Sequence, residues 1–391
     1  MLPEPARNED LSMFFSVFDE LVLRKELELL DIKPLHVYTL WTYVLAHKAV
    51  SFQDVPGLPQ AAYALLRSKF KTLSSRVQSQ STSSDASTTK LLIMLQSGQS
   101  VEAVIMRHDS SFGKYAGGPR PKNIRATLCV SSQVGCKMGC TFCATGAMGF
   151  KGNLSAGEIV EQLVHASCIT PIRNIVFMGM GEPLNNYSAV IQAVRTMTGR
   201  CFGLSPNHIT VSTVGVVPRI LSLAHDLPGI RLAVSVHAPT QELRCQIVPA
   251  ARAFPLGKLV EALNSYQAIS KQTILIEYVM LAGINDTTEN AHQLGKLLMK
   301  HEVVVNLIPY NPTLAMEGYK ASTQENVFLF QKLIREVYGL RTTIRKEMGQ
   351  DIQGACGQLA LHQTNIDRPL GTKSRPAPIL SDIEDICQMS P

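Results

Sequence analysis

The chain has 391 residues, of which 45% are hydrophobic and 17% are charged. This composition excludes a wholly disordered chain, and the length is two to three times that of a typical domain. The net charge of +6 is compatible with a polyanionic partner such as nucleic acid, but also with an ordinary protein surface.

The first residues, MLPEPARNEDLSMFF, contain acidic residues and prolines in place of a basic run followed by an apolar core. We therefore expect no secretory signal or transit peptide. No stretch approaches the roughly 18 apolar residues of a membrane helix, so we expect a cytoplasmic protein without a membrane partner. Nine cysteines in such a chain favour metal or redox chemistry over a disulfide framework.

The N-terminal part of the chain has a helical pattern. Residues 11–74 carry helical periodicity, which is interrupted at Pro34 and at the VPGLP segment of residues 55–59. We therefore predict short helices with polar connections. Residues 1–77 are assigned to a small N-terminal helical domain.

A polar segment separates this domain from the rest. Residues 78–90, QSQSTSSDASTTK, lack apolar periodicity and predict a flexible loop. Apolar runs at 91–95 and 101–106, on either side of an SGQ turn, predict a β-hairpin. Residues 78–124 are therefore expected to form a Ser/Thr-rich linker and a hairpin.

Strand and helix patterns alternate from residue 125. The predicted strands are 126–131, 174–178, 208–212, 231–236, 273–280 and 303–308. Capping-box pairs predict helix starts at Ser155 with Glu158, Asp286 with Glu289, and Ser322 with Glu325. Six successive β/α units imply a parallel sheet over residues 125–362, either open and doubly wound or a partial barrel. Residues 363–391 are Pro-rich and are expected to be a mobile tail.

Three cysteines stand close together directly after the first predicted strand of this domain. Cys136, Cys140 and Cys143 form the spacing C-x3-C-x2-C. A structural zinc site usually has a second cysteine pair, and none follows here. Three thiolates can instead hold three irons of a four-iron cluster and leave the fourth iron open. An open iron can bind S-adenosylmethionine (SAM) for reductive cleavage to a 5′-deoxyadenosyl radical, so the spacing favours a radical-SAM enzyme.

A second motif, GMGEP at residues 179–183, follows the second predicted strand. It lacks the third glycine of a dinucleotide-binding loop. Its glycines allow close approach of a ligand to the backbone, and Glu182 offers a carboxylate to an ammonium group. Polar residues fall at or just beyond the ends of successive strands, at Cys136, Glu182, Ser212, Ser235 and Asn311. Barrel enzymes assemble their sites on this face, so the pattern favours a partial barrel over an open sheet.

The chain also contains a longer series of motifs in a fixed order. These are CVSSQVGCKMGCTFCATGAMGF, FMGMGEP, TVSTVG, SVHAP, PYNP and QDIQGACGQL. From about residue 30 to about 362 the chain closely resembles the RlmN/Cfr family of radical-SAM adenosine methyltransferases. The resemblance implies a partial (β/α)6 TIM-like radical-SAM barrel with a small N-terminal helical domain that helps to grip RNA. It also implies one [4Fe-4S] cluster, two SAM molecules per product, and methylation of adenine at C2 or C8.

The resemblance assigns roles to individual residues. Cys136, Cys140 and Cys143 match the cluster ligands. The positions that match SAM contacts are Gly181, Glu182, Ser212, Ser235, Val236, His237 and Asn311. Cys356 matches the cysteine that becomes S-methylated, Cys129 its resolving partner in a disulfide, and Glu102 in VEAV the general base.

Each assignment has a simpler structural alternative. Cys356 lies between small residues, where a thiol often only packs, and Cys129 lies in an apolar strand as a core thiol would. Glu102 occupies an alternating hairpin position, where an exposed carboxylate is common, and His237 could be a core histidine. The remaining cysteines are interpreted as structural, namely Cys168, Cys201, Cys245 and Cys387. Candidates for phosphate contacts are Arg120, Lys122, Arg125, Arg341, Arg345 and Lys346.

The favoured function is methylation of adenosine C2 in large-subunit ribosomal RNA, transfer RNA or both. The GEP form of the second motif and the N-terminal helical segment favour C2 over the C8-methylating Cfr branch. A zinc-stabilised RNA-binding protein without catalysis is the alternative from another class. The expected partners are the RNA and an electron donor such as flavodoxin or ferredoxin, and the protein is expected to be a monomer.

Overall fold

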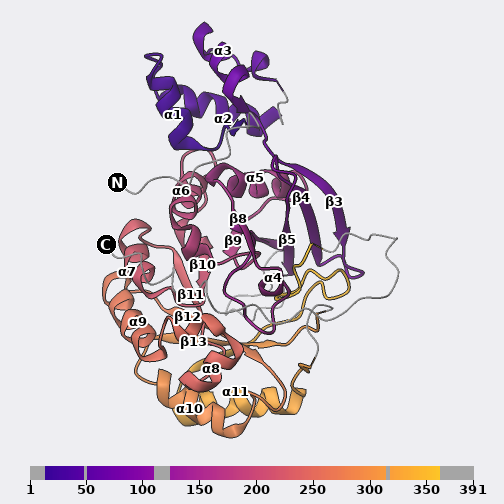
Figure 1. The fold of residues 1–391 in the computed structure, drawn as a ribbon, viewed down its shortest axis with the longest axis vertical. Coiled ribbons are helices and arrows are strands. Elements are labelled where there is room, and N and C mark those ends of the chain that lie inside the picture. Colours follow the sequence, from indigo (N-terminus) through magenta and orange to yellow (C-terminus); the bar gives the residue numbers. More distant parts are fainter. Residues whose placement is uncertain (1–13, 48–50, 110–123, 314–317, 362–391) are drawn as a thin grey trace, which may run out of the picture.

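The computed structural model describes residues 14–47, 51–109, 124–313 and 318–361 (Figure 1). Its main element is a ten-stranded sheet with the order β14-β13-β12-β11-β10-β9-β6-β5-β4-β3. The neighbouring strands that run parallel are β6 (Ile124–Cys129), β9 (Asn174–Phe177), β10 (Ile209–Thr213), β11 (Arg231–Ser235), β12 (Ile274–Met280), β13 (Val303–Pro309) and β14 (Arg341–Ile344). Six of them confirm predicted strands, and β14 was not predicted because it is short and partly polar.

Helices connect these parallel strands and lie outside them, as Figure 1 shows. They are α5 (Ala156–Ser167), α6 (Tyr187–Thr198), α7 (Val217–Asp226), α8 (Gln241–Ile247) with α9 (Leu256–Ser270), α10 (Thr288–Leu298) and α11 (Gln324–Tyr338). The apolar face of α5 is buried at Ile159, Val160, Leu163 and Val164. The partial (β/α)6 barrel is therefore confirmed. The helices cover the outside of the sheet, and the carboxyl ends of the strands are available to form a site.

One of the three predicted helix starts has the expected partners. Ser155 and Glu158 form a capping box at the start of α5. The other two predictions were wrong by one residue, because Thr287 caps α10 and Thr323 caps α11. Asp286 is not free to cap, since its Oδ1 accepts a hydrogen bond from the backbone N–H of Gly283 in the preceding turn.

The sheet continues beyond β6 with three antiparallel strands, β5 (Ser100–Asp109), β4 (Thr88–Met94) and β3 (Arg76–Thr82). The predicted hairpin is confirmed as β4 and β5. The prediction of a flexible loop at residues 78–90 was wrong, since most of this segment forms β3 and the start of β4. All side chains of β3 are exposed, so this edge strand has no buried face and shows no apolar alternation in its sequence.

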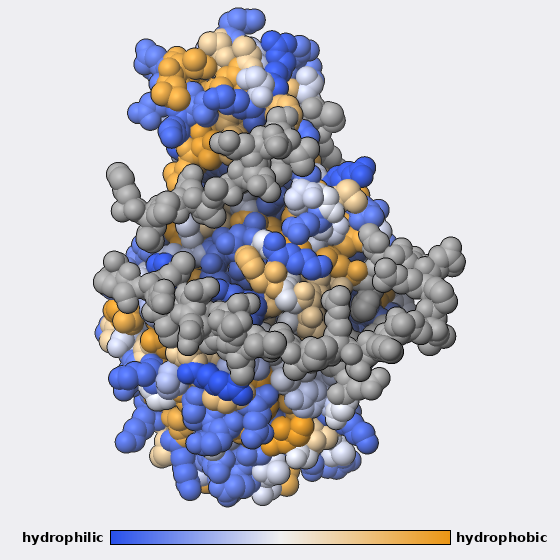
Figure 2. Space-filling view, viewed as in Figure 1, coloured by the Kyte–Doolittle hydropathy of each residue, from blue (hydrophilic) through white to orange (hydrophobic). Residues whose placement is uncertain are grey.

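The N-terminal domain consists of the predicted short helices, α1 (Glu20–Glu28), α2 (Leu35–His47) and α3 (Gln60–Lys69), with a small parallel pair, β1 (Phe15–Ser16) and β2 (Phe70–Lys71). It packs on the barrel through the buried carboxylate of Glu161 on α5. This carboxylate accepts hydrogen bonds from Ser16, Ser74 and Ser75. Figure 2 shows apolar surface at this end of the molecule, where Leu21, Leu29, Leu30 and Leu35 are exposed.

Some expectations lie outside the described residues. These are the mobile tail, Cys387, Arg120 and Lys122. Within the described part of the chain, no helix is both long and apolar enough to cross a membrane.

Candidate active site

The loop that contains Cys136, Cys140 and Cys143, called the cysteine loop here, is held by a short antiparallel hairpin that follows β6. Its strands are β7 (Gln133–Gly135) and β8 (Phe150–Asn153), and the short helix α4 (Ala144–Ala147) begins directly after Cys143. Gly135 turns the chain at φ +71°, and a Cβ there would lie 1.8 Å from the carbonyl oxygen of Gly149. Only glycine fits at this position, so the hairpin fixes where the loop begins.

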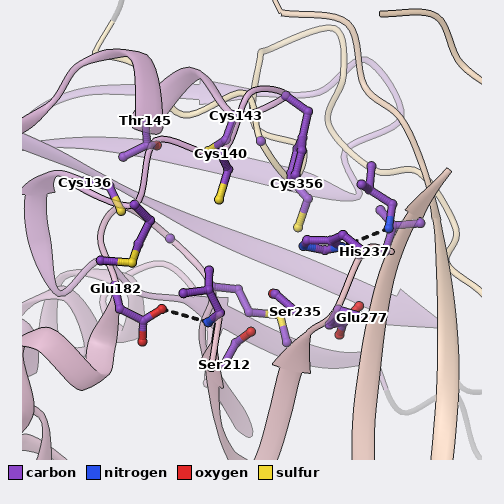
Figure 3. Close-up of a pocket in the computed structure, with 18 of the residues that line it drawn as sticks. Cys136, Cys140, Cys143, Thr145, Glu182, Ser212, Ser235, His237, Glu277 and Cys356 are labelled. Atoms are coloured by element: carbon purple, nitrogen blue, oxygen red, sulfur yellow. Dashed lines mark hydrogen bonds between the residues drawn. The ribbon is translucent and has the colours of Figure 1, made fainter. Parts of the chain in front are cut away.

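The three thiols of this loop line one cavity of about 150 Å³ (Figure 3). All three are free. Burial raises the pKa of Cys136 to about 12 and raises the pKa of Cys140 and Cys143. Hydrogen bonds from the backbone N–H groups of Gly146 and Thr145 to Cys143 oppose this shift. Iron binds thiolates, so cluster binding at this site is expected to release protons.

The donor set fits a four-iron cluster. Among the described residues, no three His, Cys, Asp or Glu side chains are placed to hold one metal ion together. A four-iron cluster does not require this convergence, because each thiolate binds a different iron. Cys136, Cys140 and Cys143 would each hold one iron and leave the fourth for another ligand.

Glu182 lines the same cavity and is buried. Its Oε1 accepts a hydrogen bond from Leu184 N at 3.0 Å. Its Oε2 accepts one from Val214 N at 2.9 Å, drawn as a dashed line in Figure 3. Burial raises the pKa of Glu182 to about 7 against these two hydrogen bonds. A ligand ammonium group in the cavity, such as that of SAM, would favour the ionised carboxylate.

The glycines of the GMGEP motif have a structural role in addition to the predicted one. Gly179 and Gly181 both line the cavity. A Cβ at Gly179 would lie 2.6 Å from the carbonyl oxygen of Val130, and a Cβ at Gly181 would lie 2.5 Å from Cβ of Gln133. Gly181 also has φ +98°. The glycines are therefore required for close packing against the chain after β6, whether or not a ligand is present.

His237 is both a core histidine and a residue of the cavity, the two interpretations that the sequence allows. It is buried with φ +58°, and its ring lies edge-on to Phe142 at 4.9 Å, as a core residue would. Its Nδ1 accepts a hydrogen bond from Val279 N at 3.1 Å, and burial lowers its pKa to about 3. The ring is therefore neutral with its proton on Nε2, and it also lines the cavity as a possible donor to a ligand.

The remaining SAM-contact candidates are placed differently. Ser212, Ser235 and Asn311 line the cavity, and their contacts with SAM stay a prediction. Val236 is buried and is not among the lining residues, and its backbone N–H donates to the carbonyl oxygen of Glu277 at 3.1 Å. The predicted contact at Val236 therefore has no direct support from this geometry.

Cys356 connects the first cavity with a second one of about 430 Å³. Cys356 lines both cavities, and Cys129 lines the second. Both are free, and burial raises the pKa of Cys129 to about 12. The structure thus brings the two distant cysteines to the same cavity, as the roles of methyl carrier and resolving thiol require.

The loop that carries Cys356 is attached to the cysteine loop. Ala144 N donates to the carbonyl oxygen of Gly357 at 2.8 Å, and Thr145 Oγ1 donates to that of Leu359 at 2.6 Å. These hydrogen bonds bring a segment more than 200 residues away in the sequence onto α4. Cys356 is therefore part of the same site as the three clustered thiols.

Comparisons with known proteins agree with this arrangement. Residues 130–294 match the Radical SAM superfamily. The dual-specificity RNA methyltransferase RlmN 1 of Myxococcus xanthus is 40% identical over 83% of this chain and 88% of that protein. The ribosomal RNA large subunit methyltransferase N of Nitrosopumilus maritimus is 40% identical over 78% of this chain and 86% of that protein. The chain belongs to the RlmN family.

A solved structure supports the same family at the level of the fold. The crystal structure of a radical SAM methyltransferase from Sphaerobacter thermophilus is 34% identical to the chain, with a TM-score of 0.78 over 88% of this chain and 99% of that one. RlmN membership makes the chain a SAM-dependent radical RNA methyltransferase that uses a [4Fe-4S] cluster. The alternative of a zinc-stabilised protein without catalysis is therefore wrong.

Glu102 is the general base that the resemblance implies. The simpler alternative, an exposed carboxylate on a strand, is wrong, because Glu102 is buried. It is 2% exposed and is not among the lining residues of either cavity. Its Oε1 pairs with Lys90 Nζ at 2.9 Å, and its Oε2 accepts a hydrogen bond from Ala360 N at 2.9 Å. The carboxylate lies under the loop that follows Cys356, so its role as a base stays a prediction.

The structure adds two residues that sequence reasoning did not place in the site. Arg345, considered only for phosphate contacts, lines both cavities together with Cys356. Glu277 also lines both cavities and was not considered. A single carboxylate inside the apolar strand IEYVM was the available signal. Of the other basic candidates, Arg125 and Lys346 line the second cavity, whereas Arg341 lines neither.

Proposed function

We propose that this chain methylates C2 of an adenosine in ribosomal RNA, transfer RNA or both, with Cys356 as the methyl carrier. The position of Cys356 is the observation that carries the proposal. Its side chain lines both the cavity of the three clustered thiols and the cavity that contains Cys129. A group carried on its sulfur is therefore open to a cofactor on one side and to a substrate base on the other.

The chemistry of the ring explains why a carrier is needed. The ring carbon of an adenine amidine is electrophilic, so it does not attack a sulfonium methyl group as an amine would. When bound, the cluster and two SAM molecules per product supply a methyl group and a one-electron route to a 5′-deoxyadenosyl radical. Cys356 holds the methyl group on its sulfur and presents it to the ring. Transfer of one hydrogen atom from that methyl group to the 5′-deoxyadenosyl radical would free its carbon to bond to the ring, which joins the RNA to Cys356 through a methylene group.

Release of the RNA is assigned to two further residues. Cys129 supplies the thiolate that attacks the Cys356 sulfur. The bond between that sulfur and the methylene carbon breaks, a disulfide forms between the two cysteines, and the released carbon takes up a proton to become the methyl group of the product. Glu102 accepts the ring proton, and the unpaired electron of the ring adduct would return to the bound cluster. The shared cavity supports the role of Cys129. The role of Glu102 requires that its contact with Lys90 or with the backbone of Ala360 opens during the reaction.

The C8-methylating branch is the runner-up, because the resemblance implies the same cluster, cysteines and mechanism for it. The GMGEP form of the second motif and the N-terminal helical domain favour C2. The proposal further includes binding of RNA by residues 1–77. It also includes an electron donor such as flavodoxin or ferredoxin, a monomeric protein and a cytoplasmic location.

The direct test is mass spectrometry of nucleosides from RNA treated with the reconstituted enzyme, SAM and reductant. The proposal expects 2-methyladenosine in digests of large-subunit ribosomal RNA or transfer RNA. Exclusive 8-methyladenosine would move the chain to the other branch. Methylation of a ribose or of another base, with adenine unmodified, would contradict both.

A further inference from the structure

Glu277 has a buried carboxylate oxygen with no hydrogen-bond partner in the described part of the chain. The residue lies in β12, opposite Ser235 of β11 and Asn306 of β13, and it is 3% exposed. Its Oε2 accepts a hydrogen bond from Asn306 Nδ2 at 2.8 Å. Its Oε1 is buried and has no hydrogen-bond partner among the described residues. A buried acceptor in this state is unfavourable until a donor reaches it.

The side chain lies in the wall that the two cavities share. Glu277, Arg345 and Cys356 line both cavities, and Figure 3 shows Glu277 beside Ser235. Asn306 lines only the second cavity, so the hydrogen bond from Asn306 holds the carboxyl against that cavity. Burial raises the pKa of Glu277, and the nearby Arg345 guanidinium and the Asn306 hydrogen bond oppose the shift.

The second cavity otherwise contains mainly hydrogen-bond donors and apolar side chains. Among the described residues that line it, the carboxylates are Glu277, which is buried, and Glu347, which is exposed. Its volume falls within the range of about 300–1,000 Å³ that is usual for small-ligand sites. A base that reacts must leave its stack and enter such a cavity. A base with an N–H donor would satisfy Oε1 of Glu277.

We propose that Glu277 recognises the exocyclic amino group of the base that enters the second cavity, and so selects adenine. This inference rests on the proposed function. The N6 amino group of adenine donates hydrogen bonds, whereas guanine and hypoxanthine carry a carbonyl oxygen at C6. That oxygen would face the carboxylate acceptor without a proton between them. Glu277 thus discriminates against 6-oxopurines, because the carboxylate oxygen of Glu277 and the C6 carbonyl oxygen of the base would both lack a donor.

The test measures binding of three synthetic RNAs to the reconstituted protein. They carry adenosine, purine riboside or inosine at the adenosine that the nucleoside experiment identifies. The wild type is expected to bind the adenosine RNA about tenfold or more tightly than the purine riboside RNA, which lacks the amino group. Glu277→Ala is expected to bind these two RNAs equally.

Glu277→Gln gives a sharper result, because the amide nitrogen can donate where the carboxylate only accepts. The variant is expected to prefer inosine to adenosine. Glu161→Gln is the matched control, since it makes the same change in a buried carboxyl at the junction with the N-terminal domain. It is expected to keep the wild-type preference. Thermal unfolding of each variant verifies that the protein tested is folded.

The same measurements show which part of the account fails. Equal loss of affinity for all three RNAs in Glu277→Ala would make Glu277 a structural residue. Weaker SAM binding with an unchanged base preference would assign it to the cofactor. Either result overturns this inference alone if the wild type still methylates the adenosine RNA. Absence of methylation by the wild type would contradict the proposed function and this inference with it.

Discussion

Asn311 Nδ2 donates a hydrogen bond to the backbone carbonyl oxygen of Cys356 at 3.1 Å. Oδ1 of the same side chain accepts one from Gln350 Nε2 at 2.6 Å. Asn311 follows β13 of the barrel, whereas Gln350 and Cys356 lie in the loop after β14. Asn311 thus attaches the loop of the proposed methyl carrier to the rigid part of the fold.

Removing this attachment is expected to misplace Cys356. Gln350→Ala leaves the cavity walls unchanged, since Gln350 lines neither cavity, but it removes one of the two hydrogen bonds at Asn311. We expect methyl loading of Cys356 to slow about tenfold, because small displacements of a reacting group are costly. Peptide mass spectrometry of Cys356 over time measures the rate. Unchanged loading together with unchanged RNA methylation would show that the loop is held by other contacts.

Substitution of a clustered cysteine is expected to affect the cluster itself, unlike substitution of the distant Cys129 or Cys356. Cys136→Ala, Cys140→Ala or Cys143→Ala should abolish both iron retention and reductive cleavage of SAM, because each thiolate binds its own iron. Iron and sulfide analysis, with the visible absorption of the cluster, measures the first effect. Cys168→Ala, which changes an exposed cysteine, is the control and should retain both. Full activity of an iron-free, zinc-loaded protein would contradict this assignment.

The release step is expected to depend on pH through Cys129. Because burial raises the pKa of Cys129 to about 12, the fraction of Cys129 present as thiolate is small near neutral pH. As long as the pH stays below this pKa, that fraction increases about tenfold with each unit of increasing pH. Release of methylated RNA from the adduct should therefore accelerate steeply between pH 7 and 9. Single-turnover release rates across this range provide the measurement.

Arg345 offers a test of the cause of this pH dependence. Its charge lowers the pKa of Cys129 against the effect of burial. Arg345→Met should therefore move the release profile to higher pH and slow release at any given pH. Arg341→Met removes the same charge from a residue that lines neither cavity and should leave the profile in place. A flat profile in the wild type would show that another step limits release.

The half-buried Lys90 and the buried Glu102 form an ion pair that is expected to stabilise the fold as well as the site. The Lys90 side chain is 14% exposed and that of Glu102 is 3% exposed. Lys90→Met leaves a buried carboxylate without its cation, so we expect a loss of about 3 kcal/mol in the free energy of unfolding. The double variant with Glu102→Gln should lose less than the sum of the single losses. Chemical denaturation measures all three values.

Glu102 itself is tested by the same variants. If Glu102 is the base, Glu102→Gln should slow release of RNA beyond what its loss of stability explains. Normal release by folded Glu102→Gln would leave Glu102 only as a contact for Lys90 and the Ala360 backbone.

Much of the fold could be predicted from local patterns in the sequence. Buried parallel strands such as β12 and β13 are apolar runs that the sequence shows directly. The edge strand β3 could not be recognised, because it buries no side chain and so has no apolar alternation. The helix starts at Thr287 and Thr323 were misplaced by one residue, because neighbouring Asp and Ser residues offer equally good caps in the sequence.

The site could be predicted where it depends on spacing and family motifs, as for Cys136 and Cys356. Contacts between distant segments were not accessible in the same way. The pairing of Glu102 with Lys90 depends on the register of β4 against β5, and the placing of Arg345 beside Cys356 depends on β14. The unpartnered oxygen of Glu277 is visible only once the surrounding side chains are in place.

The division of labour between Cys129 and Cys356 tests the central claim most directly. Each variant is incubated with labelled RNA, SAM and reductant and then separated on a denaturing gel. Cys129→Ala should accumulate a covalent protein–RNA species, because the methyl carrier is intact and the resolving thiolate is missing. Cys356→Ala should give neither adduct nor methylated RNA, although its cluster is retained. Normal turnover by Cys129→Ala, or an adduct with Cys356→Ala, would contradict the assigned roles.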